Sequence, residues 1–419
     1  NPEDIESMSV LTGAAAAALY GSNAANGAIM ITTKKGKAGA LKVTLSSNTE
    51  FLDPFVQPEF QNRYGTGSNG VRSGSGIYSW GQKLLPAARY GYTPADFFDT
   101  GHVYTNAVTV SGGTDKNQTY FSAASVNSDG IIPNNEYDRY NFTFRNTSYF
   151  LKDKLRLDAS ASYIYQKDQN MTNQGVYSNP LVPAYLFPRG DDFDNVRLYQ
   201  RWDESRNLYT QAWDYGSGDM SFQNPYWIMN KMINQTKKRR YMLSANLKYD
   251  VTDWLDVTGR VKVDNADMDI TEKRYAGTDT NFAGEKGMYS IIKRNDRQIY
   301  ADAIANIDLT FAGDYHLSAN VGASLKDVRM DFMGWGGDLR KIPNFFSITN
   351  ISTTNYKERE DGSHIQSQSI FANVELAWKS MLYLTVTGRN DWESALAFSK
   401  YKSFFYPSVG LSAVVSEMV

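Results

Sequence analysis

The sequence predicts an all-β membrane protein, an antiparallel β-barrel whose strands cross the lipid bilayer. From about residue 103 onward, segments of alternating apolar and polar residues recur at lengths that suit tilted transmembrane strands. Tight turns alternate with long connections between these segments. The longest apolar run, residues 14 to 20, is far shorter than the roughly 18 residues of a membrane-spanning helix. A closed barrel is the remaining way to pair every backbone group in lipid.

The first 40 residues predict a small α/β unit ahead of the barrel strands. They read as a strand, an alanine-rich turn of helix, a reversal rich in Gly and Asn, and a second strand. Gly13 and Gly21 bracket the helix, whose alanine face lets one backbone pack closely against another. Gly27 permits a turn with positive φ into the apolar run at residues 28–33. We therefore divide the chain into residues 1–40 and residues 41–419.

Twelve strands are expected in the second part. In one of them, Leu155, Leu157 and Ala159 alternate with Arg156 and Asp158, so one face is apolar and the other polar. The expected strands are residues 41–51, 104–112, 117–128, 139–150, 154–166, 238–250, 255–269, 297–310, 314–328, 366–378, 381–391 and 406–416.

The connections predict which end of the barrel faces which compartment. Tight turns carrying charges or Gly are expected at residues 151–154, 252–254, 312–314 and 379–381. Long loops are expected at about 52–103, 167–236, 270–296 and 329–366, and each exceeds an ordinary loop of a compact domain. Short turns at one rim and long loops at the other are typical of outer-membrane barrels, with the short side periplasmic.

Composition excludes several function classes. The 43 basic and 45 acidic residues nearly cancel, so no field attracts nucleic acid. Cysteine is absent, which excludes disulfides, thiolate zinc sites and cysteine nucleophiles, and there are only three histidines. No hydrolase motif is present. We expect neither an enzyme nor a cofactor nor a metal site, while the 28 tyrosines suit the aromatic rings at barrel interfaces.

The opening block, IESMSVLTGAAAAALYGSNAANGAIMITTKK, resembles the last part of the plug domain of TonB-dependent outer-membrane transporters. Residues 24–27 and 32–36 place the resemblance in the SusC/RagA branch of Bacteroidota. Residues 106–149, Arg389 to Trp392 and residues 404–417 resemble barrel segments of the same family, although Ala413 replaces a common tryptophan. The resemblance implies a 22-stranded barrel with a plug in its lumen. Residues 1–40 are then the end of the plug, and residues 41–419 the first half of the barrel of a longer protein.

The resemblance also implies function and partners. It implies TonB-dependent import of oligosaccharides across the outer membrane of a Gram-negative bacterium, beneath a lid formed by a SusD-like lipoprotein. An inner-membrane TonB complex would move the plug, and two pairs of transporter and lid would associate as a dimer. Lipid and lipopolysaccharide would surround the barrel, with residues 237–240, KKRR, as interfacial anchors. Oligopeptide import, a non-transporting surface receptor or adhesin, and a passive porin are the alternatives.

Candidate site residues lie in the long loops and in the plug motif. Flat aromatic faces beside carboxylates suit sugar rings, and they suit peptides nearly as well; the set is Trp202, Trp213, Trp227, Trp335, Asp191 and Asp192. The alternative is that these aromatics pack the loops on one another. The plug-motif residues are Gly13, Tyr20, Gly21, Asn26 and Gly27. Asp191, Asp192, Asp194 and Asn195 offer hard oxygens that suit calcium, but they lack the spacing of a recognised loop.

Overall fold

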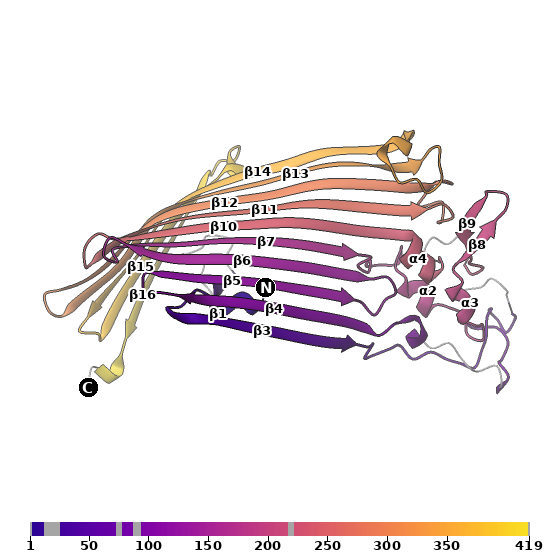
Figure 1. The fold of residues 1–419 in the computed structure, drawn as a ribbon, viewed down its shortest axis with the longest axis horizontal. Helices are drawn as coiled ribbons and strands as arrows, with labels where there is room; N and C mark the ends of the chain where they lie inside the picture. Colours follow the sequence, from indigo (N-terminus) through magenta and orange to yellow (C-terminus); the bar gives the residue numbers. More distant parts are fainter. Residues whose placement is uncertain (1, 12–25, 73–77, 87–93, 217–221, 418–419) are drawn as a thin grey trace.

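A computed structural model describes residues 2–11, 26–72, 78–86, 94–216 and 222–417. Its main feature is one twelve-stranded antiparallel sheet in the order β16-β15-β14-β13-β12-β11-β10-β7-β6-β5-β4-β3 (Figure 1). The strands are β3 (Gly39–Leu52), β4 (Gly101–Gly113), β5 (Asn117–Asp129), β6 (Glu136–Phe150), β7 (Leu155–Gln169), β10 (Met232–Asp250), β11 (Leu255–Tyr275), β12 (Gly287–Phe311), β13 (Tyr315–Leu339), β14 (Ile351–Trp378), β15 (Leu382–Glu393) and β16 (Ser403–Ala413).

Each of the twelve expected strands is present, and the four tight turns all lie at one end of the sheet. The expected loops at 270–296 and 329–366 are wrong in extent, because β11 to β14 continue far beyond the apolar segments and leave only residues 276–286 and 340–350 as connections. The physical reason is that polar and apolar side chains are mixed on both faces of these extensions. Alternation of apolar and polar residues then disappears while the backbone ladder continues. The domain boundary near residue 40 stays a prediction.

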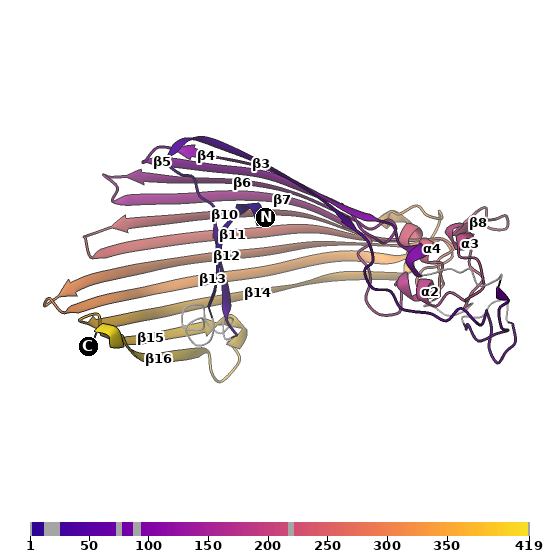
Figure 2. The same cartoon turned by 90° about the horizontal axis from the view of Figure 1, so that it is seen from below.

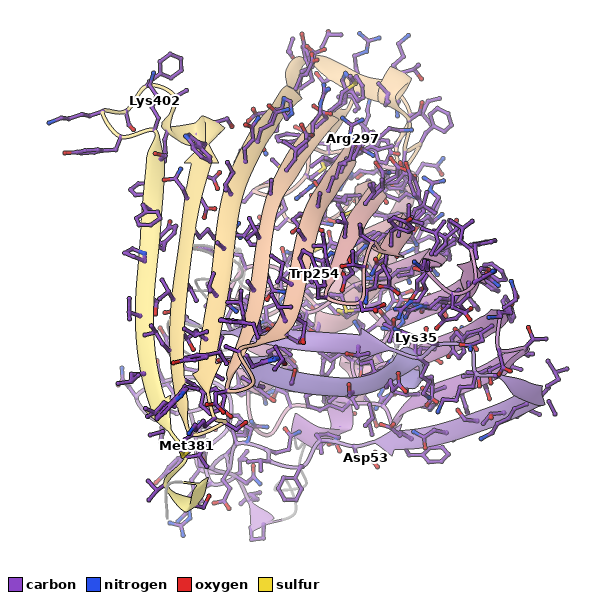
Figure 3. The ribbon with its side chains drawn as sticks, turned by 90° about the vertical axis from the view of Figure 1, so that its left-hand side faces the viewer. Lys35, Asp53, Trp254, Arg297, Met381 and Lys402 are labelled. Carbon is purple, nitrogen blue, oxygen red and sulfur yellow. The ribbon has the colours of Figure 1, made fainter. Side chains whose placement is uncertain are left out.

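A hairpin of β1 (Ile5–Leu11) and β2 (Ala28–Thr33) crosses the concave side of the sheet (Figures 2 and 3). We call this concave side the inner face and the opposite side the outer face. Gly27 enters β2 with a φ of 108°, as expected for the turn. Three short helices of the 3-10 type, η1 (Pro2–Asp4), η6 (Ser394–Leu396) and η7 (Val415–Glu417), flank strands near the two ends of the chain.

The outer face carries a band of apolar side chains that no part of the described chain covers. Val321, Ile370 and Leu384 expose 46%, 57% and 41% of their surface. In β13 the band runs from Tyr315 to Leu325, close to the roughly 9–11 residues with which a tilted strand crosses a bilayer. A registered row of Phe311, Tyr315 and Trp378 marks its lower limit, and polar residues begin above it at Asn265, Arg297, Arg329 and His364. The band has the height and chemistry of a lipid-facing surface.

Among the described residues, no helix has the length and apolar character needed to span a membrane. The α-helices of the described residues are short and belong to a separate group of loops.

This group, which we call the loop assembly, packs at the end of the sheet opposite the tight turns (Figure 1). It contains η4 (Pro94–Phe97), α2 (Leu181–Tyr185), α3 (Asp194–Arg197), the β8 (Gln200–Asp203) and β9 (Leu208–Gln211) hairpin, and α4 (Pro225–Lys231). A further turn, η5 (Ile348–Asn350), precedes β14. The assembly has its own core, formed by Phe97, Ile132, Ala184, Phe187, Phe193, Val196, Tyr226, Trp227, Ile228, Met229 and Met232.

Candidate functional site

The inner face of the sheet is largely polar and is held together by ion pairs between residues of neighbouring strands. Arg145 donates from Nε to Asp158 Oδ1 at 2.7 Å, between β6 and β7. Arg260 of β11 forms an ion pair with Asp302 of β12, with 2.7 Å between Nη2 and Oδ2. Because side chains alternate between the faces of a strand, the polar positions expected from the sequence all meet on this side. They form a hydrophilic wall in the concavity of the sheet.

The β1–β2 hairpin contacts this wall at two polar clusters. The first surrounds Asp4, which is only 7% exposed. The Tyr120 hydroxyl donates to Asp4 Oδ1 at 2.8 Å, and the Thr143 hydroxyl donates to Oδ2 at 3.3 Å. The backbone N–H of Lys34 donates to the carbonyl of Asp4 at 2.8 Å, which joins the two ends of the hairpin. The start of β1 is therefore fixed to β5 and β6.

The second cluster surrounds Asp158, whose side chain is 7% exposed. Arg145 uses one side of its guanidinium for Asp158 and donates from Nη1 to Thr33, at 2.7 Å to the hydroxyl and 3.1 Å to the carbonyl. Lys35 Nζ lies 3.7 Å from Asp158 Oδ2. The end of β2 is thus held to β6 and β7 by a buried ion pair shared between hairpin and wall. Sequence reasoning missed Asp4, Thr33 and Lys35, because nothing along the chain marks which strands the hairpin crosses.

The plug-motif residues fall partly inside the described structure. Gly13, Tyr20 and Gly21 lie outside the described residues. Asn26 is exposed at the turn before Gly27. The described part of the motif therefore supplies the turn, and the contacts with the wall come from the residues that flank it.

Trp227 is wrong as a substrate-binding prediction. It lies on α4 with 0% of its surface exposed, and its indole N–H donates to Thr278 Oγ1 at 3.0 Å. Asn224 begins this helix by accepting from the backbone N–H groups of Tyr226 and Trp227, at 2.9 and 3.3 Å. The side chain is thereby fixed in the core of the loop assembly, where no ligand reaches it.

The other three predicted tryptophans lie on different surfaces of the protein. Trp213 is half-buried against Tyr215, with 5.1 Å between ring centroids. Trp202 is 50% exposed and packs edge-on against Tyr209 across the β8–β9 hairpin at 5.2 Å. Trp335 is wrong as a predicted loop residue, because it lies in β13 opposite Ile291, on the same outer face as Leu325. Of the four predicted tryptophans, only Trp202 and, in part, Trp213 present aromatic surface on the outside of the loop assembly.

The two predicted carboxylates have separate local roles. The Tyr215 hydroxyl donates to Asp191 Oδ2 at 3.1 Å, and burial together with this carboxylate raises the pKa of Tyr215. Asp192 is exposed and accepts the backbone N–H of Asp194 at 3.0 Å. Within the described ranges, no group of three or more metal-ligating side chains is close enough together to hold an ion.

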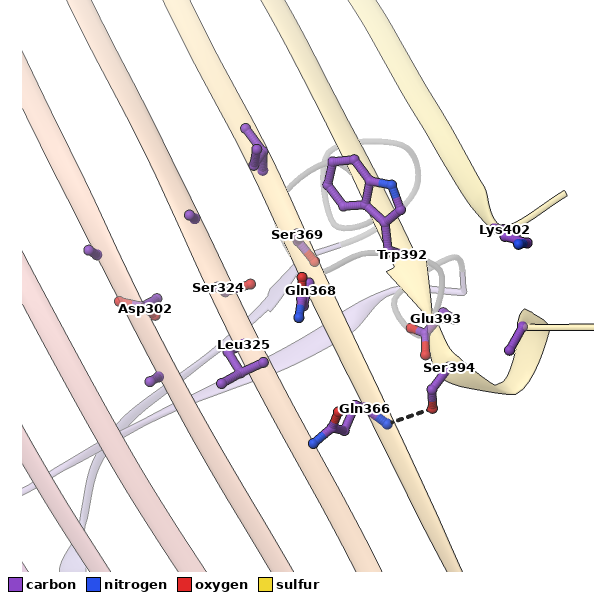
Figure 4. A pocket seen from close by; sticks show the side chains of 15 residues that line it. Asp302, Ser324, Leu325, Gln366, Gln368, Ser369, Trp392, Glu393, Ser394 and Lys402 are labelled. Atoms are coloured by element: carbon purple, nitrogen blue, oxygen red, sulfur yellow. Dashed lines mark hydrogen bonds between the residues drawn. The ribbon is translucent and has the colours of Figure 1, made fainter.

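The largest hollow that we describe, about 990 Å³, lies on the outer face rather than the inner one. Small side chains of β12 and β13 form its floor, and Leu325, Gln366 and Trp392 border it (Figure 4). The backbone N–H of Gln366 donates to the Ser394 hydroxyl at 2.8 Å beside it. Because this surface belongs to the apolar band and its upper edge, it is not a candidate for cargo passing through the lumen.

Comparison with known proteins gives relatives along the whole chain. TonB-dependent receptor P39 of Formosa agariphila is 30% identical over 430 residues, covering 100% of this chain and 38% of the receptor. TonB-dependent receptor SusC of Bacteroides thetaiotaomicron is 28% identical over 271 residues, covering 63% of this chain. The chain spans between 25% and 41% of the length of the curated relatives it matches. No family model matches it.

Solved structures share the fold at lower identity. The RagAB peptide importer in its open-open state superposes with a TM-score of 0.73 at 16% identity, covering 98% of this chain and 48% of that one. The ferric enterobactin receptor of Pseudomonas aeruginosa gives 0.54 at 13% identity, covering 99% and 47%. These likenesses identify the curved sheet as part of the wall of an antiparallel transmembrane barrel, with the β1–β2 hairpin inside it.

Proposed function

The chain belongs to the SusC/RagA-like TonB-dependent receptors of the outer membrane, and from this premise we propose that the full-length protein actively imports a nutrient oligomer. The observation that carries the proposal is the attachment of the β1–β2 hairpin to the inner wall through Asp4, Thr33 and Lys35. A segment held across the lumen by a few polar contacts closes the path and is released when those contacts are broken.

The energy for that release comes from a TonB complex of the inner membrane, which pulls on a segment ahead of the hairpin. A SusD-like lipoprotein covers the loop assembly and captures the cargo outside, and two such transporter and lid pairs associate as a dimer. Lipid and lipopolysaccharide contact the outer face. No bond of the cargo is made or broken, since the work is done by a conformational step.

Two cargo classes fit this importer. The exposed Trp202 and Tyr209 pair supports an oligosaccharide, because its aromatic faces are accessible at the mouth beside polar groups. The inner wall between the hairpin and the loop assembly supports an oligopeptide, because it carries methionine and aliphatic side chains. Both classes are too large for passive diffusion through a narrow pore.

The test is growth of a strain that lacks the full-length protein, on a panel of purified glycans and peptide digests as sole nutrients. We expect growth to fail on one class, to return with the intact protein, and to stay absent with a version whose TonB box is deleted. A surface receptor or adhesin would still bind cargo without any loss of uptake. A passive porin would support growth without the TonB box and would conduct ions steadily in planar bilayers.

A further inference from the structure

The inner face of β11 to β14 carries apolar side chains above the level of the hairpin. We call this surface the inner-wall patch; it comprises Met268, Ile270, Ile292, Val328, Met330, Phe332 and Ile365. Its residues share the face of Arg260, Asp302 and Asn320, since no bulge interrupts the pairing between those positions and the patch. The patch therefore faces the lumen, in the stretch of wall between the hairpin and the loop assembly (Figure 2).

The patch extends across four strands, with Arg294 and Asp296 of β12 between its members in β11 and β13. Ile270 pairs with Ile292 between β11 and β12, and Val328 pairs with Ile365 between β13 and β14. Phe332 lies opposite Arg294, which in turn lies opposite Met268. Most of these side chains are half-buried and Ile365 is 40% exposed. None belongs to the core of the loop assembly, so their surface is presented to the lumen rather than to another described element.

Charges of both signs lie within the patch and beside it. Arg294 donates from Nε to Asp296 Oδ1 at 2.8 Å. Arg294 lies opposite Phe332, and Asp296 lies opposite Met330. Asp361 of β14 lies opposite Phe332 on the same face. The wall here thus offers apolar contact together with a cation and carboxylates, which complements a ligand that has apolar side chains and charged ends.

This combination distinguishes between the two cargo classes. A sugar ring presents its apolar C–H groups as a flat face, for which tryptophan is the best partner. Trp335, Trp378 and Trp392 are the tryptophans in the strands of the described sheet, and all three belong to its outer face. Methionine is flexible and polarisable, and it adapts to apolar side chains of varied shape. Its presence at positions 268 and 330 suits a mixture of peptides better than one glycan.

We propose that the inner-wall patch binds the apolar side chains of an oligopeptide cargo on its way through the barrel. This inference rests on the proposed import function and assigns its substrate class. Met268, Met330 and Phe332 are the contact residues, and Arg294 and Asp296 are the groups that pair with the charged ends of the peptide.

The experiment uses the purified full-length protein and a tryptic digest of casein as the probe. Peptides that remain bound after gel filtration are identified by mass spectrometry, for the wild type and for Met330→Ser/Phe332→Ser. We expect the wild type to retain peptides enriched in Leu, Ile and Phe, and the double variant to retain about tenfold less, since it loses two apolar contacts. Met333→Ser is the matched control, because Met333 lies on the outer face of the same strand and is 42% exposed; it should bind like the wild type.

Correct folding of each variant is checked by its unchanged gel mobility before and after heating, which reports an intact barrel. Serine is polar, like most side chains of the inner face, so the double variant should fold and pass this test. A parallel sample with maltoheptaose measures glycan binding. Retention of maltoheptaose without peptides, or equal retention of peptides by wild type and double variant, would overturn the inference while leaving import intact. Growth of the deletion strain on every glycan and peptide of the panel would instead overturn the proposed function.

Discussion

Trp227 is the largest fully buried side chain in the described part of the protein. We expect Trp227→Ala to destabilise the loop assembly by about 3–5 kcal/mol, because it leaves a large cavity and the Thr278 hydroxyl loses its donor. Hydrogen exchange of the full-length protein should show lost protection in residues 181–231. The matched variant is Trp202→Ala, which removes a half-exposed ring and should leave that protection unchanged. Equal effects of the two variants would contradict the assignment of Trp227 to the core.

Trp227 is buried and Trp202 is half exposed, and the sequence could not predict this difference. Both lie in one long connection, each beside charged or polar residues, and composition gives them the same expected role. Their burial depends on which other loops fold against them, and Phe97 of that core comes from a connection more than a hundred residues earlier. Contacts between loops distant in sequence leave no periodic pattern, so the packing alternative and the binding prediction could be separated only by structure.

At the scale of elements, the β1–β2 hairpin is held by a buried ion pair that can be removed by one substitution. Asp158→Asn leaves Arg145, Lys35 and their partners without a carboxylate, and removing one side of a buried pair costs about 3–5 kcal/mol. We expect the full-length variant to conduct ions in planar bilayers more often than the wild type, because the hairpin is held more weakly.

The control for this prediction is Asp153→Asn. Asp153 pairs with Lys116 in a tight turn, where both side chains are more than half exposed, so the loss should stay below about 1 kcal/mol. Unchanged conductance of Asp158→Asn, or the same increase in both variants, would show that the second cluster does not hold the hairpin in place.

Strands were the elements that the sequence predicted best. The alternation around Leu155 or Val321 follows directly from lipid on one side and polar groups on the other, which is a constraint repeated every second residue. Above the apolar band this constraint ends, and the predicted strands stop a few residues later. Thr271, Lys273 and Lys293 are outer-face strand residues that the sequence assigned to a loop. Strand pairing there depends on the continuing ladder and not on hydrophobic pattern.

For the molecule as a whole, the position of the apolar band predicts how much a charged side chain destabilises the barrel at each depth in the bilayer. Val321→Arg places a cation near the middle of the band, and we expect it to destabilise the full-length barrel in lipid vesicles by about 2–4 kcal/mol. Met333→Arg puts the same charge on the same face of the same strand, above Arg329, and should cost less than about 1 kcal/mol. Urea titration of vesicle-inserted protein measures the free energy of unfolding of both variants. Similar losses in the two variants would show that the membrane does not lie at the apolar band.

Strand length differs between the two halves of the sheet, and this difference makes the entrance oblique. β3 to β7 have 13 to 15 residues, whereas β11 to β14 have 21 to 28. Beyond the registered row of Gln169, Gln235, Thr271, Ile291 and Trp335, at which β7 ends, β11 to β13 continue for four residues, or about 13 Å at 3.3 Å per residue. The tall side is a continuous ladder of paired strands, while the low side is completed by loops and short helices held by side-chain packing and by hydrogen bonds between loops. Opening and closing of the mouth are therefore expected on the low side, while the tall side stays fixed.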